Sequence, residues 1–164
     1  MHQDITLPEL RDSSMTLDGQ VALLTFQRHD LRNALTGSGL VDDIVDTVSW
    51  CNRTPQVSAL VITGDGSAFS AGGNIKEMQE RETTHRDGPF GGDVHTVQQK
   101  YREGIQRMPL AVYNAEIPVI AAVNGPAIGA GFDLTCMCDI RIGSSNTMLG
   151  ETFVNLGLIP GDGG

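Results

Sequence analysis

The chain has 164 residues, of which 40% are hydrophobic and 19% are charged, a composition typical of an ordinary globular protein with one domain. Its formal net charge of −9 at pH 7 argues against nucleic acid or an anionic membrane surface as the main partner. No apolar run approaches the roughly 18 residues that a membrane-spanning helix needs. We therefore expect a protein that binds neither nucleic acid nor a membrane.

The cysteine and histidine residues indicate neither a disulfide framework nor a metal site. The number of cysteines is odd, and the histidines are scattered along the chain. The cysteines are Cys51, Cys136 and Cys138, and the histidines are His2, His29, His85 and His95. We expect reduced thiols in a cytoplasmic protein and no bound metal.

The first part of the chain predicts a hairpin and a helix. Residues 1–13 carry no clear period and are predicted to be a loose leader, so that the domain spans residues 14–164. Residues 14–17 and 20–26 flank an Asp-Gly pair, a combination typical of a β-hairpin. From about residue 36 to residue 52, apolar residues recur on one helical face, which predicts an amphipathic helix.

A turn of small residues follows the next predicted strand. Residues 59–64 form a short apolar run, the pattern of a buried strand. The small residues 70–73 then allow close approach of the backbone to a ligand. Asn74 is a suitable cap for a helix that begins after it.

The same order of strand, turn and helix returns later in the chain. Residues 118–123 are predicted to form a buried strand, and a glycine-rich turn leads into a helix over residues 132–138. This order places unpaired backbone N–H groups at the start of a helix. Asp133 follows Ala130 by about one helical turn, so its carboxylate is expected to face the same place. Amides beside a carboxyl group make a site suited to enolate chemistry.

The remaining segments predict simpler elements. Residues 79–96 are polar and glycine-bearing, so we expect a surface loop, with a mobile loop over the site as the alternative. Residues 97–115 predict a helix that Pro109 kinks or ends early. Residues 140–143 predict a short strand.

Six segments, in the same order, resemble the enoyl-CoA hydratase/isomerase family, also called the crotonase superfamily. They are residues 32–35, 69–78, 118–125, 129–133, 138–141 and 157–161. The resemblance extends from about Val21 onward. It implies an α/β fold of the crotonase type, a spiral of stacked ββα units, apparently without the C-terminal helical part. By this comparison the chain corresponds to the N-terminal core of a longer protein.

The resemblance also implies a chemistry. Backbone N–H groups of Gly73 and Ala130 are expected to hold a thioester carbonyl oxygen, and Asp133 matches the first of two catalytic glutamates. Phe153 stands where the family has the second, so Glu151 is a possible helper. Asp162 is another candidate acid, although a solvated turn carboxylate is the favoured interpretation of that residue.

Three functions remain open at this point. The reaction is either hydration of an enoyl-CoA, a lyase activity, or isomerisation of its double bond, as in fatty-acid metabolism. A catalytically silent acyl-CoA-binding or oligomer-forming homologue is the alternative. A nucleotide-binding Rossmann protein lacks its glycine fingerprint here, and a serine hydrolase lacks a histidine for Ser70.

The ligand and the assembly are implied by the same resemblance. Coenzyme A is expected as part of the acyl-CoA substrate, with no separate cofactor, and a homotrimer or a dimer of trimers is expected of the full-length protein. Arg28, Arg32 and Lys76 are expected near the phosphates of coenzyme A, because guanidinium and ammonium groups bind phosphate. The complete set expected along coenzyme A is Arg28, Arg32, Ala34, Ala71, Gly73, Ile75 and Lys76.

Overall fold

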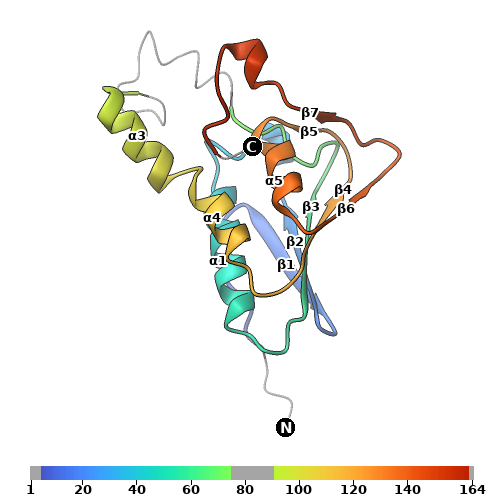
Figure 1. Ribbon diagram of the computed structural model, residues 1–164. Helices are drawn as coiled ribbons and strands as arrows, with labels where there is room; N and C mark the ends of the chain where they lie inside the picture. Colours follow the sequence, from blue (N-terminus) through green and yellow to red (C-terminus); the bar gives the residue numbers. More distant parts are fainter. Residues whose placement is uncertain (1–4, 75–90, 163–164) are drawn as a thin grey trace.

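The computed structural model describes residues 5–74 and 91–162 (Figure 1). Its main sheet has the strand order β1-β2-β3-β4-β6, in which β1 pairs antiparallel with β2 and the other pairs are parallel. The strands are β1 (Ser13–Asp18), β2 (Val21–Phe26), β3 (Ala59–Gly64), β4 (Val119–Val123) and β6 (Ile140–Gly143). The predicted hairpin and the three later strands are confirmed.

Helices and a second, smaller sheet complete the fold. The helices are α1 (Leu40–Asn52), α3 (Val94–Glu103), α4 (Arg107–Tyr113) and α5 (Ala130–Met137). The small parallel sheet pairs β5 (Ala127–Ile128) with β7 (Leu149–Gly150), and the short 3-10 helices are η1 (His29–Leu31) and η2 (Phe153–Leu156). Within the described part of the chain, no helix has the length and apolar character needed to cross a membrane.

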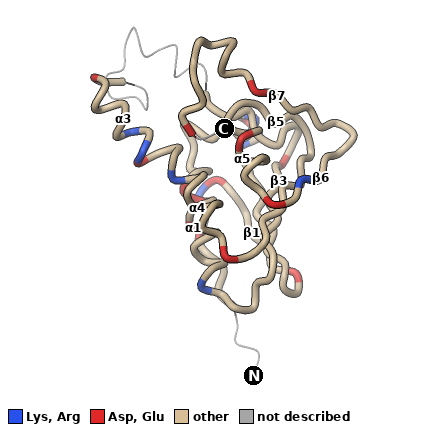
Figure 2. Tube along the Cα trace, in the orientation of Figure 1, with Lys and Arg blue, Asp and Glu red and all other residues tan. Residues whose placement is uncertain are grey.

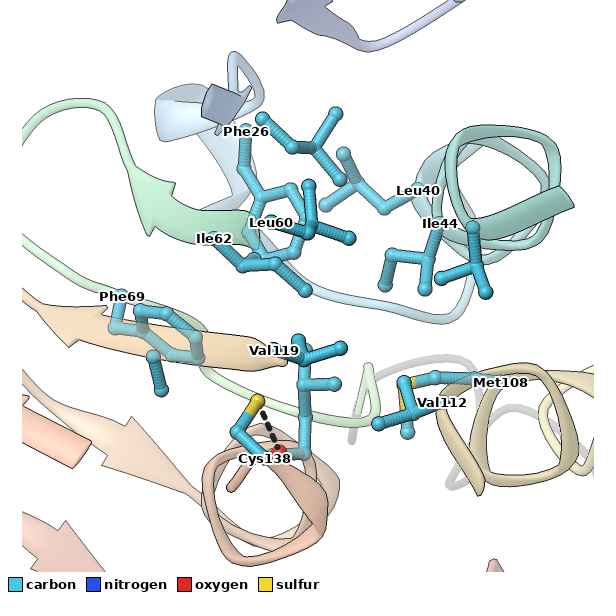
Figure 3. Packing of buried hydrophobic residues seen from close by; sticks show 14 of the residues in the cluster. Phe26, Leu40, Ile44, Leu60, Ile62, Phe69, Met108, Val112, Val119 and Cys138 are labelled. Atoms are coloured by element: carbon cyan, nitrogen blue, oxygen red, sulfur yellow. Dashed lines mark hydrogen bonds between the residues drawn. The ribbon is translucent and has the colours of Figure 1, made fainter. Parts of the chain in front are cut away.

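The hydrophobic core lies on one face of the main sheet. The parallel register sets Ala22 opposite Leu60 and Leu60 opposite Val119, so the buried residues of three neighbouring strands share this face. Figure 3 shows Leu60 and Val119 beside Leu40 and Ile44 of α1. Residues of α4 and α5 join the same cluster, so these helices are held against the sheet by apolar burial.

The helix predicted over residues 97–115 is wrong, because two helices occupy this part of the chain. The break lies at Gly104, which has φ −107° and ψ −114°, outside the helical region. Pro109 falls instead in the first turn of α4, where its missing N–H is tolerated. The first of these helices begins at Val94, inside the predicted loop, because Asp93 caps it by accepting the N–H of Thr96 at 2.8 Å.

The leader predicted to be loose is held to α1 over its described part. Asp43, only 2% exposed, accepts the backbone N–H of Arg11 at 2.8 Å and that of Asp12 at 2.9 Å. The helix that carries Asp43 begins at Leu40, later than the predicted residue 36. An amphipathic pattern does not reveal this attachment, because it places acidic residues on the outer face of a helix.

We expect Asp43→Ala to lower the free energy of unfolding by about 2 kcal/mol or more, because it leaves two backbone donors without their carboxyl acceptor. Urea unfolding of the purified protein measures this. Asp46→Ala, at an exposed position on the same helix, is the control and is expected to change stability by less than about 0.5 kcal/mol. Equal effects of the two substitutions would contradict the attachment.

Candidate active site

Three backbone segments from distant parts of the sequence lie side by side near the carboxyl ends of the central strands. The Leu35 N–H donates to the Gly72 carbonyl at 2.8 Å, and the Ile128 N–H donates to the Ser70 carbonyl at 3.0 Å. Ala34 also forms a parallel bridge with Gly72. The segment around Gly72 is therefore fixed from both sides.

Two buried polar side chains tie these segments together. The Asn33 side-chain amide donates to the carbonyls of Asp65 (3.0 Å) and Ala68 (2.9 Å). The Ser70 hydroxyl donates to the Asn33 carbonyl at 2.7 Å and accepts the Gly72 N–H at 3.1 Å. Both residues are fully buried. Sequence reasoning did not assign them this role. The signal that could have found Asn33 is that asparagine adopts a left-handed φ, here 54°, more readily than most residues.

The two predicted turns meet through glycines. Gly72 has φ 74°, and a Cβ on it would lie 2.3 Å from the Ile128 carbonyl oxygen and 3.0 Å from the Ala130 nitrogen. A Cβ on Gly131 would lie 2.5 Å from the Ser70 carbonyl oxygen. Only residues without a side chain permit this approach. The turn before Gly73 and the start of α5 are thus in direct backbone contact.

Two amides at this contact, those of Gly73 and Ala130, have no acceptor in the described part of the chain, whereas two later amides of α5 do. The Phe132 and Asp133 N–H groups both donate to the Gly129 carbonyl, at 2.7 and 2.9 Å. For the Gly73 and Ala130 N–H groups, no acceptor is found among residues 5–74 and 91–162. Ala130 is the first residue of α5, where an N–H has no partner within the helix. Since Gly73 follows Gly72 directly, both amides belong to the meeting point of the turns.

Asp133 lies in the first turn of α5 and is only 3% exposed. Its Oδ2 atom is buried without a hydrogen-bond partner in the described part of the chain. Burial, together with the neighbouring carboxyls of Glu151 and Asp162, raises the pKa of Asp133 from 3.8 to about 8. The structure therefore brings together the residues that the sequence grouped here, and it adds a protonated carboxyl near neutral pH.

Asp162 is buried rather than solvated, so the interpretation favoured from the sequence is wrong. It is 4% exposed, and neither carboxyl oxygen has a hydrogen-bond partner among the described residues. The preceding residue holds it inside, because the Gln106 side-chain amide donates to the Gly161 carbonyl at 2.6 Å. Gly161 also packs on the Tyr101 ring, where a Cβ would lie 2.7 Å from Cε1. Burial raises the pKa of Asp162 as well.

Phe153 places an apolar ring, not a carboxylate, beside the start of α5. A Cβ on Gly129 would lie 3.8 Å from its Cζ atom, and the ring packs against the core cluster. Glu151 directly follows β7 and is exposed. Its carboxyl raises the pKa of Asp133. Position 153 therefore supplies no carboxylate here, and the carboxyls that raise the pKa of Asp133 are those of Glu151 and Asp162.

The basic residues expected near coenzyme A differ in their surroundings. Arg28 pairs with Asp12 at 3.1 Å and with Asp30 at 3.0 Å, and these carboxylates raise the pKa of its guanidinium. The exposed Arg32 makes no ion pair with any residue of the described ranges. Arg32 is therefore the more available of the two arginines. Lys76 lies outside the described residues.

Of the other positions expected along coenzyme A, Ala34 and Ala71 form part of the packed backbone. Ala34 is 4% exposed within its bridge to Gly72, and the Ala71 N–H donates to the Arg32 carbonyl at 2.9 Å. Ile75 is not among the described residues. Both alanines thus shape the backbone beside Gly73 rather than offering charge.

A cavity of about 240 Å³ adjoins this region. It is lined by residues 35–38, by the start of α1, by the end of α3 with Tyr101, by Gly104 and Ile105 in the break, and by Arg107 of α4. Lys100 and Arg102 lie in the last turn of α3 and Arg107 begins α4, with the acidic Glu103 among them, and both kinds of charge also occur on other elements (Figure 2). Two of its lining residues also contact segments of the site, since the Leu35 N–H donates to the Gly72 carbonyl and the Tyr101 ring packs on Gly161.

The fold and the site define an α/β protein in which two turns, each following a parallel strand, bring two amides without acceptors in the described part of the chain close to a buried carboxyl group. Comparison with known proteins places it further: the family model for enoyl-CoA hydratase/isomerase matches residues 16–164. The chain belongs to this family. The resemblance found in the sequence and the crotonase fold are thereby confirmed.

Relatives and solved structures agree with this assignment. The chain is 36% identical over 159 residues to the short-chain-enoyl-CoA hydratase of Clostridium acetobutylicum, covering 95% of this chain and 55% of the relative. It is 39% identical over 146 residues to the crotonyl-CoA hydratase of Syntrophomonas wolfei, covering 88% and 51%. A crystal structure of an enoyl-CoA hydratase from Bacillus anthracis matches with a TM-score of 0.78 and 28% identity, covering 93% of this chain and 55% of that one.

The match covers a smaller share of each relative than of this chain. An enoyl-CoA hydratase structure from Polaromonas sp. JS666 matches with a TM-score of 0.76 and 32% identity, over 90% of this chain but 54% of that one. The chain thus spans about half the length of the relatives that it matches.

The meeting of the turns predicts a large cost for Gly72→Ala. A left-handed φ alone costs about 1–3 kcal/mol for a residue other than glycine, and here the new Cβ also collides with two backbone groups. Gly19→Ala is the matched control, because Gly19 has φ 59° with nothing within 4 Å of its Cβ position. Denaturant unfolding should show a clearly larger loss for Gly72→Ala. Equal losses would mean that the turns do not touch.

The raised pKa of Asp133 predicts how stability changes with pH. Between pH 3.8 and about 8 the folded state holds a proton that the unfolded state releases. This group therefore stabilises the fold fully below about pH 4, and its contribution falls as pH rises toward 8, by up to about 1.4 kcal/mol per pH unit. Compared with the native protein, Asp133→Asn should lose less stability between pH 5 and about 8. Parallel stability curves for the two proteins would contradict the buried proton.

Proposed function

We propose that this chain carries the catalytic core of an enoyl-CoA hydratase, in which the N–H groups of Gly73 and Ala130 bind the thioester carbonyl oxygen. The observation that supports this most strongly is the backbone contact between Gly72 and Ala130, with the buried Asp133 beside it. The names of the relatives point to the same activity.

The two amides would act on the charge that develops during the reaction. As water adds to the double bond, electrons move to the thioester oxygen and form an enolate. N–H groups fixed by the packing of the glycines stabilise this oxyanion more than the neutral thioester, which is the difference that lowers a barrier. Loss of one such donor typically costs about 10²–10³ in rate.

Asp133 and Glu151 divide the proton transfers in this proposal. The exposed Glu151 takes a proton from water as the oxygen bonds to the β-carbon. The enolate then takes a proton at the α-carbon from Asp133, whose pKa of about 8 keeps it protonated near neutral pH. A proton passes from Glu151 back to Asp133, so the enzyme returns to its first state and one water has been added.

The substrate would lie across the three packed segments. Arg32 is the basic side chain proposed for the coenzyme A phosphates, with Ala34 and Ala71 allowing close approach of the ligand. The cavity beside α3 and α4 is proposed to take the acyl chain. Lys76 and Ile75 remain predictions, as do the trimeric assembly and a place in fatty-acid metabolism.

Isomerisation of the double bond is the second candidate. The observation that favours it is Phe153, whose ring occupies the position expected for a second glutamate beside α5. Asp133 in its ionised form, which its raised pKa makes available as pH approaches 8, would then remove a proton from one carbon and return it to another. A silent acyl-CoA-binding protein is less well supported, because Asp133 and Glu151 together supply an acid and a base.

The direct test follows the ultraviolet absorbance of the conjugated thioester in a short enoyl-CoA. Hydration removes this absorbance, whereas isomerisation of a 3-enoyl-CoA creates it. We expect Asp133→Asn to lower kcat by about 10²–10⁴, because the acid is lost, with coenzyme A binding retained. The exposed Asp46→Asn on α1 is the control and should retain full turnover.

Glu151→Gln separates the two reactions. Hydration should fall by about 10²-fold or more, because no other group in the proposal takes the proton from water. Isomerisation, which needs Asp133 alone, should be nearly unchanged. Tight coenzyme A binding without turnover of either substrate would contradict the enzyme assignment.

A further inference from the structure

Asp133 and Asp162 form a buried pair of carboxyl groups that neither the family match nor the names of the relatives describe. The two residues are 3% and 4% exposed, and they come from α5 and from the last described segment of the chain. Three of their four carboxyl oxygens are buried with no hydrogen-bond partner in the described ranges. Two facing carboxylates can only accept, so these oxygens stay unpaired until one group carries a proton.

We propose that Asp133 and Asp162 share one proton at neutral pH, with Asp133 as the donor and Asp162 as the acceptor. Asp162 then acts as the positioning residue that keeps Asp133 in its acid form. Two buried like charges in contact are strongly unfavourable, and this is why such pairs hold one proton between them. The proposal deepens the proposed function and rests on it for its kinetic test.

The surroundings of the pair allow this assignment. From the described elements packed against the two carboxyls, the titratable group that acts on both is Glu151, and no cationic side chain acts on either. The hydrogen bond between the two carboxyls raises the pKa of Asp133 and by itself lowers that of Asp162. This is the pattern expected when Asp133 donates and Asp162 accepts. Burial raises the pKa of both groups, so the shared proton is retained in neutral solution.

The backbone also holds Asp162 in this position. Its neighbour Gly161 is fixed by the hydrogen bond from Gln106 and by contact with the Tyr101 ring. These two residues lie on either side of the break between α3 and α4. The break therefore holds the segment that carries Asp162, whose carboxyl acts on Asp133 of α5.

The pair has a consequence for the proposed reaction. When Asp133 gives its proton to the enolate carbon, a C–H bond forms, and two carboxylates are left facing each other in a buried place. Their repulsion favours rapid return of a proton from Glu151, which received one from water. Asp162 would thus speed the reset of the acid without touching the substrate.

Infrared spectroscopy tests the shared proton without substrate. A protonated carboxyl group has a carbonyl band distinct from that of a carboxylate, and the native protein should show one such buried group at pH 7. Asp162→Asn should abolish the band at pH 7, because the new amide donates to an ionised Asp133. Asp46→Asn, at an exposed site on α1, should leave it unchanged.

Two results would contradict the proposal that Asp133 and Asp162 share a proton. The first is the absence of the band from the native protein at pH 7, a measurement that needs no variant to fold. The second is a band that persists unchanged in Asp162→Asn, which would mean that burial alone protonates Asp133.

The pH dependence of kcat gives the kinetic test. In Asp162→Asn the alkaline limb should move to lower pH, so that turnover falls about 10-fold or more at pH 7.5 and recovers as pH is lowered. A purely structural role would reduce turnover equally at all pH values and would contradict the proposal. If the infrared result holds but no enoyl-CoA is turned over by the native protein, the proposed function fails and the shared proton stands.

Discussion

The site depends on the contact between the Gly72 backbone and the start of α5. A Cβ at Gly72 would fall within 3.0 Å of the Ala130 nitrogen, so the two turns approach as closely as backbones can. Hydrogen bonds from both neighbouring segments and the buried Asn33 and Ser70 hold this approach. The placement of the Gly73 and Ala130 amides, which have no acceptor among the described residues, is therefore a property of the packed core.

The same packing determines the chemistry of the carboxyl groups. The helix that begins at Ala130 carries Asp133 into the interior, where burial and nearby carboxyls raise its pKa. Asp162 acts on it from a distant part of the sequence, in a segment that Gln106 and the Tyr101 ring hold at Gly161. In the proposed function, oxyanion binding by backbone dipoles and proton delivery by a neutral acid would thus come from adjacent parts of the same packed core.

The sequence predicted the features that depend on local pattern. Alternating apolar residues and an Asp-Gly turn indicated the hairpin, and the glycines of both turns indicated close backbone approach. It did not predict the break at Gly104, because an apolar stripe continues across it, or the burial of Asp162, because a Gly-Asp-Gly segment is typical of an exposed turn. Both depend on contacts between distant segments, such as that between Tyr101 and Gly161, which no local pattern contains.

The central claim is that two main-chain N–H groups hold one thioester oxygen. The most direct test is the carbonyl stretching frequency of an isotope-labelled acyl-CoA thioester bound to the protein. Two hydrogen bonds polarise the carbonyl, so the account predicts a frequency clearly lower than that of the free thioester in water. A bound thioester with an unshifted carbonyl would show that these amides do not bind it.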